Sequence, residues 1–150
     1  MEKKVLEIIG LASDHAGFEM KEYLKEWLII GGYEVIDFGC LSSESCDYAD
    51  FAHPLAISVS DGTCTCGLSL CGSGNGINMT VNKHPKIRSA LCWNKEIASL
   101  ARRHNDANIC ALPARFLNRQ EAQDIISEFL NTGFEGGRHS IRIAKIPIKG

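Results

Sequence analysis

The 150-residue sequence lacks any run of about 18 apolar residues, so no membrane-spanning helix is expected. It also lacks a strong net charge: the formal value is −2, which predicts no general attraction to nucleic acid or to an anionic membrane. Any bound anion must therefore be held by a local cluster of cations. Glu7 interrupts the first apolar segment and no small-residue cleavage site follows, so we expect no secretory signal.

Regular cysteine spacing is missing as well. The seven cysteines form no disulfide framework and include no C-x2-C pair, which predicts free thiols in a reducing compartment, the cytoplasm. Cys64, Cys66 and Cys71 are spaced as C-x-C and C-x4-C, unlike the ligands of a structural zinc ion, so we expect no metal. Repeats and linkers are absent too, and the length suits a single domain over residues 1–150.

What the sequence does contain is an alternation of short apolar runs and longer amphipathic ones. The expected strands are 5–12, 33–38, 67–71, 88–92 and 107–112, and the expected helices are 18–30, 51–60, 77–82, 95–103 and 119–130. Helix 18–30 should present Phe18, Leu24, Trp27 and Leu28 on one face, and Pro54 should lie in a first helical turn. This order predicts an α/β fold with a five-stranded parallel sheet between two helical layers.

Polar segments follow the first three expected strands, at 13–17, 40–48 and 71–76. Because open parallel sheets bind ligands beyond the carboxyl ends of their strands, these segments should converge on one crevice.

The segment from Cys71 to Gly76 is the most informative, because it has three glycines in five positions after the cysteine. Glycines let the backbone turn sharply and aim several N–H groups at one anion, and the helix that follows adds its dipole. Such a site also favours a thiolate. A tight strand–helix connection with a buried thiol is the alternative. Known phosphate-loop patterns do not fit, because Ile77 stands where a glycine or an arginine would be needed.

Three other polar clusters could carry chemistry. Asp14 and His15 could hold a hydroxyl or a phosphate, or Asp14 could simply cap a helix. His104 and Asn105 precede the fifth expected strand, which is the wrong end of the sheet for a shared crevice, so they form either a polar turn or part of a neighbouring subunit's site.

The third cluster is near the C-terminus, where Gly136-Gly137 is followed by Arg138, His139 and Arg142. On a helical turn Arg138 and Arg142 share a face, and two guanidinium groups would grip a phosphate. A solvated basic tail is the alternative.

The chain resembles the B-type ribose-5-phosphate isomerases, which are grouped with bacterial galactose-6-phosphate and allose-6-phosphate isomerases. The matching segments, in the family's order, are 13–17, 42–44 with 47–48, 71–76, 103–108 and 135–142. They are spread along nearly the whole chain, from residue 13 to residue 142.

The resemblance implies a Rossmann-like three-layer sandwich and an aldose–ketose isomerase that interconverts D-ribose 5-phosphate and D-ribulose 5-phosphate in the non-oxidative branch of the pentose phosphate pathway. It implies no cofactor and no metal. It also implies a homodimer, or a dimer of dimers, with the sites between subunits.

The resemblance also implies residue roles. Cys71 is similar to the base that moves a proton between C2 and C1, and Ile77 supports this branch of the family because other members have a glutamate just after the loop. Ser73 would assist at the sugar oxygens, and His104, with Asp14 nearby, would open the furanose ring. The implied anion hole comprises Gly72, Ser73, Gly74, Asn75 and Gly76, and the implied phosphate ligands are His15, Arg138 and Arg142, with Asn105 and Arg115 contributing.

Three alternatives stay open at this point. The same chemistry could act on a six-carbon sugar, allose 6-phosphate or galactose 6-phosphate. A non-enzymatic nucleotide-binding or flavin-binding module would explain the glycine loop, but not the thiol and the arginine pair. A phosphatase with Cys71 as nucleophile would release inorganic phosphate.

Overall fold

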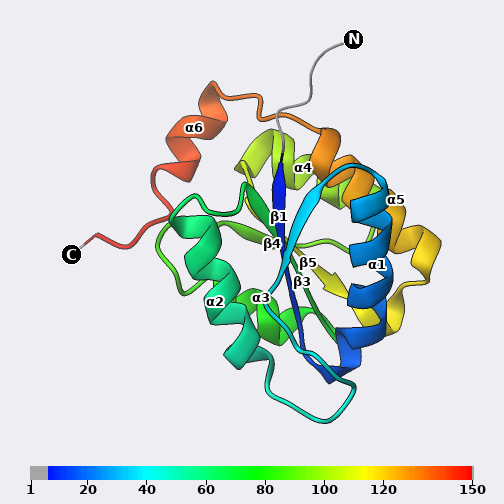
Figure 1. Cartoon of the computed structure of the whole chain (residues 1–150). Helices are drawn as coiled ribbons and strands as arrows, with labels where there is room; N and C mark the ends of the chain where they lie inside the picture. Colours follow the sequence, from blue (N-terminus) through cyan, green and yellow to red (C-terminus); the bar gives the residue numbers. More distant parts are fainter. Residues whose placement is uncertain (1–6, 150) are drawn as a thin grey trace.

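The computed structural model describes residues 7–149, so the expected strand start at residues 5 and 6 lies outside the described part. Within it, five parallel strands form one sheet in the order β2-β1-β3-β5-β4 (Figure 1). The strands are β1 (Ile8–Ser13), β2 (Glu34–Asp37), β3 (Cys66–Cys71), β4 (Ser89–Leu91) and β5 (Ile109–Pro113). The predicted five-stranded parallel sheet is confirmed.

Helices cover both faces of the sheet. They are α1 (Phe18–Ile30), α2 (Tyr48–Ser60), α3 (Asn75–Val81), α4 (Lys95–Asn105), α5 (Arg119–Asn131) and α6 (Arg138–Ile143), with 3-10 turns η1 (His15–Gly17) and η2 (Ala114–Phe116). Side chains from α1, α4 and α5 share one buried cluster, and those from α2 and α3 share the other. Alternate strand residues serve opposite faces, as Leu70 and Cys71 of β3 do. None of these helices is long and apolar enough to span a membrane.

Two helices differ from the prediction. α2 begins at Tyr48, so Pro54 lies in its second turn and not in its first. Pro54 is exposed, which lets the helix tolerate the missing N–H at this position. The sequence pattern predicts no element after residues 119–130, yet residues 138–143 form α6. Most other helix and strand boundaries differ from the predicted ones by one or two residues.

A buried lysine was also missed. The predicted apolar face of α1 includes Leu24 and Leu28, but fully buried Lys21 lies on it too. Its Nζ donates to Asp37 Oδ2 at 2.6 Å, and Lys25 Nζ donates to the same oxygen at 2.8 Å. Burial alone would raise the pKa of Asp37, but the hydrogen bonds from both lysines and from the Gly39 amide outweigh it, so the pKa is lowered. Asp37 thereby anchors the start of the loop after β2 to α1.

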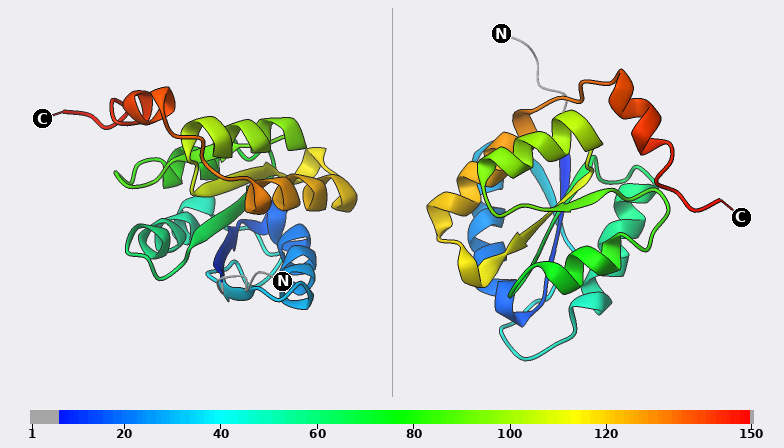
Figure 2. Two further views of the ribbon diagram at one scale, coloured as in Figure 1. Left: turned by 90° about the horizontal axis from the view of Figure 1, so that it is seen from above. Right: turned by 180° about the vertical axis from the view of Figure 1, so that it is seen from behind.

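The strand order determines where a ligand would bind. The chain moves from β1 to one neighbour, β2, and later returns to the other side of β1 to form β3, so the loops after β1 and β3 leave a crevice between them. Figures 1 and 2 show the loop after β2 at this carboxyl end of the sheet. They also show α6 at the opposite end of the molecule, projecting from its edge.

Candidate functional site

The crevice between β1 and β3 is built largely from main-chain contacts. The Asp14 amide donates to Leu70 O at 3.2 Å, and the Asp14 carboxylate accepts from the Gly17 amide at 3.1 Å. A side chain on Gly17 would come within 2.9 Å of Leu70 O, so only glycine lets η1 pack against β3. Asp14 is therefore a buried cap, one of the two roles considered for it, and it holds His15 at the mouth of the crevice.

His15 is oriented by the loop after β2. Its Nδ1 accepts a hydrogen bond from the Cys46 amide at 3.2 Å. In the neutral ring the proton then lies on Nε2, which leaves that nitrogen free to donate to a ligand. The first two of the three predicted segments thus meet, as expected.

Cys71 and the glycine loop follow one another at the carboxyl end of β3, next to the switch point of the sheet. Cys71 ends β3 beside Pro113 of β5 and is only 4% exposed. Gly74 has φ of 77°, and a side chain there would lie 2.5 Å from Leu91 Cδ1. The backbone at Gly74 is therefore in the left-handed region and closely packed against Leu91, and only glycine accommodates both without strain.

Two further contacts complete this end of the site. The ring of Tyr48 packs directly on Gly76, joining the third predicted segment to the second. The Arg115 amide donates to Gly72 O at 3.0 Å, and a side chain on Gly72 would lie 3.2 Å from the guanidinium Nη1. Arg115 thus places a cation over the loop.

The remaining predicted residues lie elsewhere. His104 and Asn105 end α4, and Arg138 and Arg142 belong to α6, which packs against α4 at the amino end of the sheet. The position of His104 and Asn105 agrees with the prediction. The resemblance implies that Asp14 lies near His104 in the assembled site; within one chain the two residues lie at opposite ends of the sheet.

The structure therefore divides the predicted residues into two groups. The carboxyl-end group is Asp14, His15, Cys71, Gly72, Ser73, Gly74, Asn75, Gly76 and Arg115, and the amino-end group is His104, Asn105, Arg138 and Arg142.

Two further residues, Glu135 and His139, lie beside the amino-end group. Glu135 Oε1 lies 3.7 Å from His104 Nε2 and 3.6 Å from His139 Nε2. The two histidine rings stack with centroids 4.2 Å apart. Burial lowers the pKa of His139, and neighbouring His104 and Arg138 lower it further. The i, i+4 spacing of Glu135 and His139 was the one available sequence signal.

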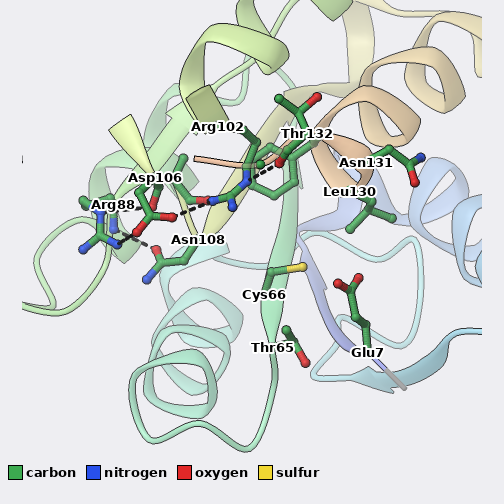
Figure 3. Close-up of a pocket in the computed structure, with 13 residues that line it drawn as sticks. Glu7, Thr65, Cys66, Arg88, Arg102, Asp106, Asn108, Leu130, Asn131 and Thr132 are labelled. Atoms are coloured by element: carbon green, nitrogen blue, oxygen red, sulfur yellow. Dashed lines mark hydrogen bonds and ion pairs between the residues drawn. The ribbon is translucent and has the colours of Figure 1, made fainter. Parts of the chain in front are cut away.

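A cavity of about 550 Å³ also opens at the amino ends of the strands, beside Cys66 (Figure 3). Its two arginines share one carboxylate: Arg88 and Arg102 both pair with Asp106, at 3.2 and 3.0 Å. Burial raises the pKa of the Cys66 thiol to about 12, which disfavours a reactive thiolate. Cys66, the thiol that lines this cavity, is therefore poorly suited to act as a base.

Fold and site together define an α/β protein with a buried thiol and a glycine loop at the switch point of a parallel sheet. The family model described as ribose/galactose isomerase matches residues 9–146. The chain belongs to this family, as the motifs predicted.

Individual relatives agree. Ribose-5-phosphate isomerase B of Escherichia coli (strain K12) is 38% identical, over 92% of this chain and 93% of that protein. The structure of ribose-5-phosphate isomerase B from Clostridium thermocellum has a TM-score of 0.92 at 45% identity, over 93% of this chain and 94% of that one. The Mycoplasma genitalium enzyme, solved with bound ribulose-5-phosphate, has a TM-score of 0.89 at 38% identity, over 93% of both chains.

Proposed function

We propose that the protein interconverts D-ribose 5-phosphate and D-ribulose 5-phosphate, with Cys71 as the base. The observation that carries this proposal is the place of Cys71: a buried thiol at the end of β3, beside the glycine loop and the switch point of the sheet. The bound ribulose-5-phosphate of the Mycoplasma genitalium relative supports the choice of substrate.

The reaction moves one proton from C2 to C1 and another from O2 to O1, and it needs no external oxidant or reductant. The Cys71 thiolate takes the proton from C2 of the open-chain aldose, the electron pair forms an enediolate, and the thiol returns the proton to C1. The amides of residues 72–76 stabilise the negative oxygen of the enediolate, and the Ser73 hydroxyl assists proton exchange between O1 and O2. Burial of Cys71 keeps bulk water away from the intermediate.

The substrate phosphate needs cations, which come from both ends of the sheet. His15 Nε2 and Arg115 are available at the carboxyl end, whereas Arg138 and Arg142 lie on α6. We assign phosphate binding to these groups with Asn105, and opening of the furanose ring to His104. Asp14 acts chiefly by orienting His15 through its cap on η1.

This division supports a homodimer with sites between subunits. A two-fold contact would place the amino-end group of one subunit over the Cys71 crevice of its partner. The projecting α6 and the residues after it expose Ile141, Ile146 and Ile148, apolar surface that such a contact would cover. All seven cysteines are free, which supports a reducing compartment such as the cytoplasm.

The test is to incubate the pure protein with ribose 5-phosphate, without added metal, and to follow ketose formation. Allose 6-phosphate and galactose 6-phosphate are run in parallel. We expect turnover of ribose 5-phosphate. Turnover of only a six-carbon sugar would contradict the proposed substrate while keeping the family's chemistry, and turnover of none would contradict the proposed function.

A further inference from the structure

Three side chains at the amino end of the sheet bring their ligand atoms close together. His104 lies in the last turn of α4, Glu135 in the segment before α6, and His139 in the first turn of α6. Their side-chain ligand atoms lie within 4.8 Å of one another, and each histidine Nε2 lies within 3.7 Å of Glu135 Oε1. Modest side-chain movement would bring all of them to one ion.

His139 provides the second observation. Its side chain is only 7% exposed, and its Nε2 is buried without a hydrogen-bond partner. Glu135 Oε1, at 3.6 Å, is too far for a hydrogen bond. Buried polar atoms in folded proteins nearly always have partners, so a nitrogen left in this state indicates a missing ligand or ion.

We propose that His104, Glu135 and His139 bind zinc or a similar divalent transition ion. Two imidazoles and one carboxylate form a donor set typical of zinc sites that keep an open position for water. Magnesium and calcium prefer sites built from oxygen atoms, so the two nitrogens select against them.

Neighbouring charges limit the affinity. Arg103 lies beside Glu135, but its Nη1 faces Oε2, at 3.7 Å, and leaves Oε1 to the ion. Arg138 and Arg142 are close enough to lower the pKa of His139, and their positive charge will also repel a dication. The nearly parallel rings, 13° apart, mean that His104 must turn to point its nitrogen at the ion. His104 is 36% exposed and free to do so, whereas His139 is held in place.

The site deepens the proposed function and rests on it in one respect, the role of His104. An ion bound at Nε2 removes the lone pair that ring opening requires, so metal at this site inhibits the isomerase. The ion is an inhibitor and takes no part in proton transfer at Cys71.

Cobalt(II), used as a coloured substitute for zinc, tests binding without any substrate. We expect visible d–d bands that saturate at about one equivalent, and loss of at least about tenfold in affinity in Glu135→Gln. His84→Gln is the matched control, because His84 Nε2 lies 2.8 Å from His53 Nδ1 in the other histidine pair of the described chain. Equal titrations of wild type and Glu135→Gln would overturn the site, as would loss of the signal in the control or sulfur-to-cobalt charge-transfer bands.

Zinc titration of isomerase activity tests the inhibition. We expect inhibition that a chelator reverses, with Glu135→Gln requiring at least about tenfold more zinc. Equal zinc sensitivity would mean that zinc acts elsewhere, for instance on Cys71, and would overturn the inhibitory role. A protein inactive on every sugar phosphate would contradict the proposed function alone, because the cobalt result still decides whether the metal site exists.

Discussion

The two ends of the sheet present their functional groups in different ways. At the carboxyl end most of these groups belong to the backbone: amides, a left-handed glycine and a capped turn lie near a buried thiol. At the amino end the groups are side chains on α4 and on the projecting α6, and Arg138 and Arg142 are exposed. In the proposed dimer, the glycine loop of one chain and the cations of the other would complement each other.

The largest expected effect concerns the carboxyl end. Cys71→Ala removes the base, so we expect turnover of ribose 5-phosphate to fall about 10³-fold while substrate binding, measured by calorimetry, changes little. Cys46→Ser, at the same end of the sheet, should keep near-native turnover. A Cys71→Ala protein with wild-type turnover would remove the thiol from the mechanism.

The second prediction asks whether the two ends meet between chains. Cys71→Ala and His104→Gln should each be nearly inactive alone. Co-expressed, they should recover about a quarter of wild-type activity, because half of randomly paired dimers are mixed and each mixed dimer has one intact site. Activity no greater than the sum of the separate variants would show that the two groups do not share a site.

The arginines of α6 come next. Arg138→Ala and Arg142→Ala should each raise KM roughly 10- to 150-fold, the equivalent of about 1.5–3 kcal/mol for a charge-assisted contact to phosphate, with a smaller change in kcat. Lys149→Ala, on the same C-terminal segment, serves as the control for general loss of charge. Unchanged KM in both arginine variants would break the assignment of this end to phosphate binding.

The ion pair behind the crevice should show in stability. Asp37→Asn leaves buried Lys21 with only the longer ion pair to the more exposed Glu22 carboxylate, which we expect to lower the free energy of unfolding by about 3 kcal/mol at pH 7. Because the pKa of Asp37 is lowered in the folded protein, its contribution is full above the ordinary carboxyl value of about 4 and is lost as the pH falls through the lower folded value. Urea denaturation should therefore show the difference between variant and wild type shrinking in acid. A difference independent of pH would contradict the ion pair as its source.

The smallest effect separates backbone strain from close packing. Gly74→Ala forces a positive φ on alanine and brings its side chain within 3.1 Å of the backbone of Leu112 and Pro113. Gly62 has φ of 86° with nothing within 4 Å, so Gly62→Ala reports strain alone. We expect the free energy of unfolding to fall by about 1 kcal/mol in Gly62→Ala and by about 2 kcal/mol or more in Gly74→Ala. Only Gly74→Ala should also reduce kcat. Equal effects would mean that the glycine loop is not held by its close contacts.

Local patterns in the sequence were sufficient to predict most of the helices and strands of this protein and the loop after Cys71. Apolar periodicity predicted the order of strands and helices up to α5, and glycine spacing predicted the loop after Cys71, because both signals depend on neighbouring residues. The placement of His104 at the amino end also followed from strand order along the chain.

Only the tertiary structure decided which distant residues meet. The burial of Lys21 depends on Asp37, which comes from another element. Pro54 was expected in a first helical turn, but α2 begins at Tyr48, whose ring packs on the distant Gly76. The cluster of His104, Glu135 and His139 depends on α6 folding back onto α4. Sequence patterns report the state of a segment, whereas proximity depends on the strand order and on the packing of the whole chain.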